Sequence, residues 1–364
     1  MKKRQLILGL VALVALAALL FWGRNRLHFD FGAFRAQLAQ ANWVKIALSA
    51  ACIYVAYAIR SVRWAQLLKH NKQLAPFSLL GTQVIGFTAV ALIGRVADPV
   101  RPYLVAKKTG LPLSSQIAVY IVERLFDAGS MALIFSVAML SVPYADVMKA
   151  TSHSHMISLL GAQSPALAAF GARFGGLVLT LFGALFLVAV RLAGSTVASI
   201  AERTFGLFSK KLGVAAGEKI RAFHAGLDTM RSFSDFSVTA GLSIVHWVLI
   251  AGAYFLGIQA FSASPELAAV TPSKCVMLMI ASGGASIFQL PILGLFTQIA
   301  IVAAALTGLF GANAEAATAC ATILLITTFL AVIPVGLIWA QLDHVSLRKV
   351  TEHAGEVVTE EKPV

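Results

Sequence analysis

Residues 79–108, LLGTQVIGFTAVALIGRVADPVRPYLVAKK, decide how this chain folds. The run 79–94 is apolar, but it is shorter than the about 20 residues that a helix needs to cross a bilayer. The segment from Arg95 to Pro102 interrupts it, and Lys107 and Lys108 follow. If 79–94 crossed the membrane, these lysines and later cationic loops would lie on the side that the positive-inside rule disfavours.

The composition places this segment in a membrane protein. Hydrophobic residues make up 59% of the 364 positions, and the mean hydropathy is +0.82, far above the values of soluble domains. Apolar runs follow one another along the whole chain, at 5–22, 44–59, 79–94, 116–142, 174–193, 237–261, 274–309 and 315–340.

The formal net charge of +13 comes from lysines and arginines that flank the apolar runs. Cations in these positions are typical of cytoplasmic loops, so we expect no nucleic-acid partner. Lys2, Lys3 and Arg4 predict a cytoplasmic N-terminus, and the run 5–22 is expected to be an uncleaved signal anchor.

A hairpin removes the conflict at 79–94. If this run enters from the cytoplasm, breaks and returns, then 101–115 and 194–236 are both cytoplasmic. The run 274–309 contains Gly283-Gly284 and a break from Gln289 to Gly294, and we expect a second hairpin there, entering from outside. Both halves then have the order span, hairpin, span in opposite orientations, as in transporters built from inverted repeats.

The predicted fold is an all-α polytopic membrane protein with about six full spans and two re-entrant helical hairpins in an inverted-topology repeat. We expect it in the inner (cytoplasmic) membrane with both termini in the cytoplasm. The predicted segments are a signal anchor and external linker (1–43), a first repeat (44–142) with its hairpin at 79–105, an external loop, span 174–193 and cytoplasmic amphipathic linker (143–236), a second repeat (237–345) with its hairpin at 274–309, and a cytoplasmic tail (346–364).

The first hairpin carries charge at its predicted tip. Asp98-Pro99 is typical of a helix start, with Asp98 as N-cap and Pro99 in the first position. Arg95 and Arg101 flank it, which favours an anion such as phosphate. The alternative is that Asp98 only neutralises the two arginines and holds the hairpin closed.

A second charged group begins the run 116–142. Glu123 and Asp127 lie four residues apart on one helix face, with Arg124 between them. Because charge in the bilayer is costly, we expect the carboxylates to pair with Arg60, Arg63 or the hairpin arginines; the alternative role is a proton or head-group ligand.

Three residues at the end of the run 44–59 and just beyond it, Arg60, Arg63 and Trp64, share one helix face. They are expected either to anchor the helix at the interface by snorkelling or to contact a phosphate at the mouth of a cavity.

The second half is neutral by comparison. Its hairpin offers hydrogen-bonding groups and no charge: Ser282, Ser286, Gln289, Thr297 and Gln298. His246 lies in an apolar run, and we expect it to bond a backbone carbonyl rather than relay protons. Residues 203–233 have apolar residues at helical spacing and are predicted to form an amphipathic surface helix.

Motifs of soluble enzymes are missing from the sequence. GxxxxGK[ST], HExxH, GxSxG and CxxC patterns do not occur, and the three cysteines lie inside apolar runs. We therefore expect no catalytic residues, no metal and no cofactor, and we do not expect the chain to be an enzyme.

Three segments resemble a known family: IRSVRWAQLL, GRVADPVRPYLVAKKTGLPLSSQIAVYIVERLFDAG and QLPILGLFTQIAIVAAALTG. They are similar to the lysylphosphatidylglycerol synthase transmembrane-region (flippase-like) family over roughly 40–340. The family pattern Gly-Arg-x-Gly-Glu-x-x-Arg matches at Gly94, Arg95 and Arg101, with Ala97-Asp98 in place of Gly-Glu. Its Glu-Arg-x-x-Asp pattern matches at Glu123, Arg124 and Asp127. A late glutamate of the family is replaced by Gln298.

This resemblance implies a lipid flippase or scramblase-like protein without the synthetase domain, with a membrane phospholipid as its substrate. The substrate-binding residues that we predict are Arg60, Arg63, Arg95, Asp98, Arg101, Glu123, Arg124, Asp127, Gln289 and Gln298. Two alternatives stay open: a secondary transporter of a small anionic solute, and a non-transporting membrane partner of a lipid-modifying enzyme.

Overall fold

A computed structural model describes residues 29–142, 144, 165–227, 232–285 and 293–345. All regular secondary structure in these ranges is helical, as predicted. The predicted signal anchor 5–22, most of the external loop and the whole tail 346–364 lie outside the described residues.

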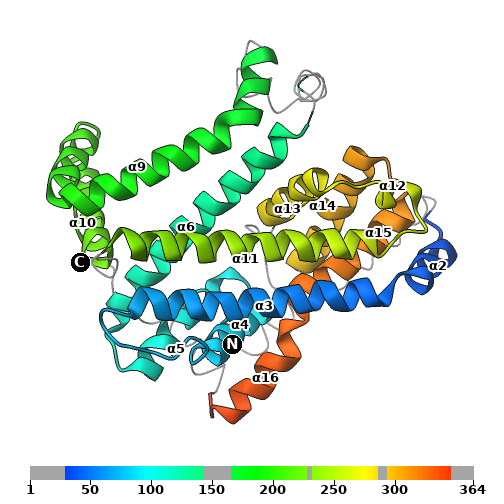
Figure 1. Ribbon diagram of the computed structural model, residues 1–364, viewed down its shortest axis with the longest axis horizontal. Helices are drawn as coiled ribbons and strands as arrows, with labels where there is room; N and C mark the ends of the chain where they lie inside the picture. The colour runs from blue at the N-terminus through cyan, green and yellow to red at the C-terminus, as the bar shows by residue number, and fades with distance from the viewer. Residues whose placement is uncertain (1–28, 143, 145–164, 228–231, 286–292, 346–364) are drawn as a thin grey trace, which may run out of the picture.

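Two long antiparallel helices form the centre of the molecule, α3 (Trp43–Leu68) and α11 (Phe233–Gln259) (Figure 1). The short helix α2 (Phe31–Gln40) precedes α3. The Asn42 side chain accepts the Lys45 N–H and caps α3, and Ser232 and Asp235 form a capping box at the start of α11. Between the two helices, the Ser49 hydroxyl donates to the Ala253 carbonyl at 2.7 Å.

The first predicted hairpin is a helix, a break and a second helix. It comprises α4 (Leu80–Ile93), the 3₁₀ turn η1 (Arg95–Ala97) and α5 (Val100–Thr109), and α4 packs against α5. The break is at Gly94, which has φ 88° and ψ −171°. Residues with a Cβ rarely adopt this backbone conformation.

The expected helix cap at Asp98 is wrong. Asp98 has helical dihedral angles, φ −53° and ψ −38°, and its N–H bonds the Arg95 carbonyl at 3.0 Å. The 3₁₀ turn therefore leads directly into α5, whose first residue Val100 follows Pro99 without a side-chain cap.

Helix α6 (Leu113–Leu140) packs beside α9 (Pro165–Gly206), and α10 (Lys210–Leu227) returns along α9. Ala193 interrupts α9 with non-helical angles of φ −140° and ψ 42°, at the end of the predicted span 174–193. The predicted surface helix 203–233 is divided, because α9 ends at Gly206 and α10 begins at Lys210.

The second predicted repeat also contains two helices that pack on each other, and residues 286–292 between them lie outside the described residues. After the short α12 (Pro265–Ala268), α13 (Pro272–Ala285) packs against α14 (Leu293–Phe310). The last span is α15 (Ala314–Leu325), a π-helical turn η3 (Ile326–Leu330) and α16 (Val332–Leu342). Each hairpin also contacts the other half, α4 against α16 and α13 against α6.

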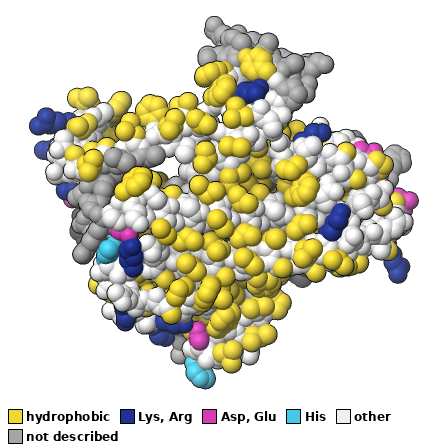
Figure 2. Space-filling view, viewed as in Figure 1, with side chains coloured by type: hydrophobic (Ala, Val, Ile, Leu, Met, Phe, Trp, Pro, Cys, Tyr) yellow, Lys and Arg dark blue, Asp and Glu magenta, His cyan; other side chains and the backbone are white. Residues whose placement is uncertain are grey.

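Three helical stretches among the described residues are long and apolar enough to cross a membrane: Trp43–Leu68, Phe233–Gln259 and Ala314–Leu342. Leu80–Ile93 and Gly294–Phe310 are apolar but shorter. Helix α6 is 28 residues long, but it carries Glu123, Arg124 and Asp127. Figure 2 shows apolar side chains over much of one face of the molecule, with lysines and arginines mostly toward its edges.

Candidate functional site

The candidate site is a buried cluster of arginines and carboxylates between α3, α5, α6 and α11. Helix α3 supplies Arg60 and Arg63, whose exposed fractions are 4% and 0%. Both side chains are directed into the protein, so the interpretation of Arg60 and Arg63 as snorkelling anchors is wrong. Helix α3 continues to Leu68 instead of ending at the predicted position 59, and this keeps both arginines inside the fold.

Arg63 joins the two carboxylates of α6. Its Nη2 lies 2.5 Å from Glu123 Oε1, and its Nη1 lies 2.7 Å from Asp127 Oδ1. Arg60 approaches the same pair, at 3.2 Å from Glu123 Oε1 and 3.3 Å from Asp127 Oδ2. The predicted pairing of Glu123 and Asp127 with Arg60 and Arg63 is therefore confirmed. It is possible because α6 presents the two acids one turn apart.

Arg101 enters the cluster from the first hairpin. It is fully buried, and its Nη1 lies 3.4 Å from Glu123 Oε2 and 3.5 Å from Gln83 Oε1 on α4. A Cβ on Gly86 would overlap the Arg101 side chain, so the glycine makes room for it. The guanidinium lies over the ring of Phe87, 4.6 Å from its centroid, in a cation–π contact.

Arg124 is the most exposed charge of the cluster. Its Nη2 lies 3.1 Å from Asp127 Oδ2, yet one third of the side chain is exposed. It also lies over the Tyr120 ring, 5.2 Å from the centroid.

Helix α11 completes the site with neutral groups. Arg63 donates to Ser243 Oγ at 2.8 Å, and the Trp247 indole N–H donates to Asp127 at 3.2 Å. Ser243, Trp247 and Gln83 were not predicted as site residues. The spacing of Ser243, His246 and Trp247 places all three on one face of α11 and is the signal that identifies this group.

The contacts of His246 determine its tautomer. Nε2 lies 2.7 Å from Arg60 Nη2, and Nδ1 lies 3.0 Å from the Ala56 carbonyl oxygen. A guanidinium has no acceptor, so Nε2 accepts from Arg60 and Nδ1 carries the proton that it donates to Ala56. The expectation that His246 bonds a backbone carbonyl is confirmed.

The cluster has more positive than negative charge. Four arginines (Arg60, Arg63, Arg101 and Arg124) face two carboxylates (Glu123 and Asp127), and four minus two leaves +2 with His246 neutral. The cluster also contains buried nitrogen atoms that donate hydrogen bonds but have no hydrogen-bond partner. They are Nε of the four arginines, Nη2 of Arg101, and the amide Nε2 of Gln83 and Gln116. Such a site matches a ligand that brings negative charge and acceptor oxygens.

The remaining predicted residues lie elsewhere. Arg95 and Asp98 pair with each other at 3.8 Å on the exposed side of the first hairpin. Gln298 belongs to a neutral group in the second half, where its amide donates to Ser282 Oγ at 3.3 Å, and Ser282 is 2.7 Å from the Tyr254 hydroxyl. Gln289 lies outside the described residues. In the described part of the chain, no three His, Cys, Asp or Glu side chains come together in a group that could hold a metal ion.

A family model described as the lysylphosphatidylglycerol synthase TM region matches residues 6–336, which confirms the resemblance seen in the sequence. No curated protein and no solved structure matches the chain.

Proposed function

Since the chain belongs to the lysylphosphatidylglycerol synthase TM-region family, we propose that this membrane protein is a lipid translocase. Its substrate would be a phospholipid or another lipid with an anionic head group, moved between leaflets as by a flippase or scramblase. It would perform no covalent chemistry itself, and it would lie in the inner membrane with both termini in the cytoplasm.

The observation that carries this proposal is the positive surplus of the buried cluster. A phosphate diester brings one negative charge and several acceptor oxygens, and the cluster offers +2 and donors without partners. Leaving such charge uncompensated inside a membrane protein is costly. We therefore assign the head group to Arg60, Arg101 and Arg124.

The arrangement of the helices supports two inverted halves. In each half the hairpin packs against its own last span, α5 on α6 and α14 on α15, while its first arm packs against the other half. In transporters with inverted repeats, the substrate site lies at such an interface of helix breaks near the midplane. The proposed membrane arrangement is thus six spans with two re-entrant hairpins.

The alternatives differ in what the site would hold. A solute transporter needs a cavity enclosed by protein, whereas a lipid needs a hollow that opens sideways; a hollow between α6, α9 and α11 opens among exposed apolar side chains. A non-transporting partner of a lipid-modifying enzyme would co-purify with that enzyme and exchange no lipid alone.

The proposal is tested by leaflet exchange of fluorescent phosphatidylglycerol in proteoliposomes. We expect Arg101→Gln to slow exchange by about 10- to 100-fold, because hydrogen bonds to charged groups contribute about 1.5–3 kcal/mol. Arg95→Gln is the matched control, since Arg95 is 43% exposed and pairs with Asp98 outside the cluster, and its rate should stay near that of the unchanged protein. Equal exchange rates in the unchanged protein, Arg101→Gln and Arg95→Gln would show that the cluster takes no part in lipid exchange.

A further inference from the structure

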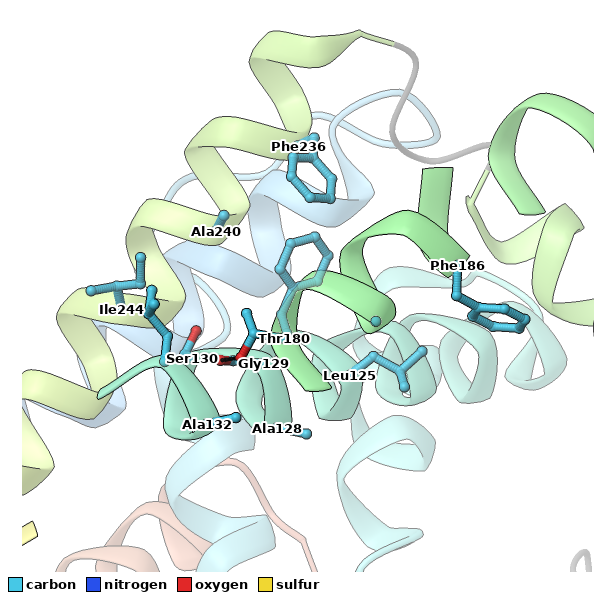
Figure 3. A pocket seen from close by; sticks show the side chains of 13 residues that line it. Leu125, Ala128, Gly129, Ser130, Ala132, Thr180, Phe186, Phe236, Ala240 and Ile244 are labelled. Atoms are coloured by element: carbon cyan, nitrogen blue, oxygen red, sulfur yellow. Dashed lines mark hydrogen bonds between the residues drawn. The ribbon is translucent and has the colours of Figure 1, made fainter. Parts of the chain in front are cut away.

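The hollow between α6, α9 and α11 lies beside the cluster. The proposed function uses only the fact that it opens sideways, and does not say what it binds. It has a volume of about 360 Å³, within the usual size range of small-ligand sites. Figure 3 shows residues that border it, from α6 (Ala128, Gly129 and Ala132), α9 (Thr180 and Phe186) and α11 (Phe236, Ala240 and Ile244).

Small residues in the sequence create this hollow. A Cβ built on Gly129 of α6 or on Gly183 of α9 meets no atom within 4 Å. Two turns away on α9, a Cβ on Gly176 would lie 2.5 Å from Ser136 Oγ and 2.8 Å from the Ala132 carbonyl oxygen. The two helices are therefore in close contact at Gly176 and leave space at Gly183.

The lining of the hollow suits hydrocarbon. Among the described residues, those that border it carry no charge, and their polar side chains are the hydroxyls of Ser130 and Thr180. The Thr180 hydroxyl is already bonded to the Gly176 carbonyl at 2.7 Å. A polar ligand would lose its hydrogen bonds to water here without replacing them, whereas an apolar chain loses none.

The hollow is continuous with the apolar outer surface of the molecule. On α9, next to Gly183, the side chains of Leu181, Phe182 and Leu185 are 61%, 68% and 65% exposed. On α11, Val245 and Val248 are about half exposed. In a membrane protein, side chains of this kind face lipid tails, so an occupant enters the hollow from the bilayer.

Arg124 is a partly exposed cation of α6 that directly precedes Leu125, a residue that borders the hollow, although Arg124 is not itself part of the lining. It lies one turn before Ala128 on α6, which places the two residues on adjacent parts of the same face. One third of its side chain is exposed, and it belongs to a cluster with surplus positive charge. A lipid whose chain lies along α6 therefore meets a cation at the position of its head group.

We propose that the hollow between α6, α9 and α11 is a binding site for one acyl chain of an acidic phospholipid, whose phosphate pairs with Arg124. This inference rests on the proposed lipid substrate, but it states only that a lipid binds here and not that the lipid is moved between leaflets. A lipid bound here without being exchanged between leaflets would leave this inference intact and the proposed function wrong.

The test uses phosphatidylglycerol with a photoreactive diazirine near the end of one acyl chain. The full chain is reconstituted in phosphatidylcholine vesicles that contain this probe, and labelled peptides are mapped by mass spectrometry. We expect labelling of 129–133 to exceed that of Val248, which is 54% exposed on the outer surface of α11 and does not border the hollow. Gly129→Leu and Gly183→Leu should each reduce the ratio about tenfold by filling the hollow from different helices.

Gly241→Leu is the matched control, because Gly241 is an exposed position of α11 outside the hollow and a Cβ there meets no atom within 4 Å. Its labelling ratio should not change. Arg124→Gln should remove the preference for the phosphatidylglycerol probe over a phosphatidylcholine probe with the same chain. Labelling of 129–133 equal to that of Val248, or labelling unchanged in both folded leucine variants, would overturn the chain site. A lipid preference unchanged by Arg124→Gln would overturn the assignment of the phosphate.

Discussion

At the scale of single residues, Glu123 has the largest structural role in the cluster. It pairs with Arg63 at 2.5 Å, Arg60 at 3.2 Å and Arg101 at 3.4 Å, and thereby connects α6 to α3 and α5. Its own exposed fraction is 1%. Arg124 Nη2 also lies 3.8 Å from Glu123 Oε2, so any change of the Glu123 charge acts on four arginines at once.

We expect Glu123→Gln to lower the free energy of unfolding by about 3–5 kcal/mol, as when one partner of a buried pair is removed. The control is Glu202→Gln, because Glu202 pairs with Arg221 at 3.2 Å on the surface and such exposed pairs contribute at most about 1 kcal/mol. Unfolding in detergent measures both variants. Equal losses would mean that Glu123 is not the centre of the cluster.

The sequence allowed part of this site to be predicted. Glu123 and Asp127 had to pair because charge is costly in a bilayer, and Arg60 and Arg63 were near enough in the chain to be considered. Ser243 and Gln83 were not found, because a single serine or glutamine in an apolar run fits many roles until the neighbouring helix is known. Asp98 was misassigned because Asp-Pro fits both a cap and a continuous turn.

At the scale of elements, the last span depends on a π-helical turn. The Ala331 N–H bonds the Ile326 carbonyl at 2.7 Å, across five residues. Carbonyls at the start of α16 are bonded from other helices: the Tyr54 hydroxyl donates to Ala331 at 2.6 Å, and the Thr88 hydroxyl donates to Val332 at 3.1 Å. The break therefore lies where α3 and α4 supply the donors.

Close packing of α16 on α4 follows from glycines in both helices. A Cβ on Gly336 would overlap the Thr88 side chain and lie 3.1 Å from the Val84 carbonyl, and a Cβ on Gly81 would lie 2.6 Å from Trp339 Nε1. The sequence predicted each of these helices, but it contained no indication of which face of α16 meets α4.

We expect Gly336→Ala to destabilise the protein by about 1–3 kcal/mol through overpacking. Gly308→Ala is the control, since a Cβ there meets no atom within 4 Å, and alanine should be neutral or stabilise by about 0.4–1 kcal/mol. The unfolding midpoint of the Gly336→Ala variant should therefore fall, while that of the Gly308→Ala variant should stay the same or rise. A stable Gly336→Ala variant would contradict the close packing of α4 and α16.

At the scale of the whole molecule, α3 and α11 hold the two halves together along their full length. At one end the Asn42 N–H bonds the Ala260 carbonyl at 2.8 Å, and at the other His70 Nε2 lies 2.8 Å from Asp235 Oδ2. The first helix–break–helix unit was predicted from the shortness of the run 79–94 and from the positive-inside rule, which acts on loops without knowledge of packing. The second was predicted also from Gly283-Gly284 and the break from Gln289 to Gly294. Their orientation in the membrane stays a prediction.

Topology is tested by cysteine labelling with a membrane-impermeant maleimide in a variant without native cysteines. We expect Lys107→Cys and Lys211→Cys to react from the cytoplasmic side only, and Ala314→Cys from the outside only. All three positions are exposed. Reaction of Lys107→Cys from outside would show that α4 crosses the membrane, and it would contradict the re-entrant hairpin.

The charge of the buried cluster has an electrical consequence. The cluster alone carries +2, and a phosphate diester of charge −1 leaves +1, so a site that moves through the membrane moves charge in both states. Each elementary charge that crosses the whole field corresponds to about 2.3 kcal/mol per 100 mV. Lipid exchange should therefore change with a potassium diffusion potential imposed across the vesicles, and in opposite senses for the two polarities. A rate independent of voltage would contradict the movement of an anionic head group across the field, because a lipid of charge −1 carries that charge even past fixed arginines.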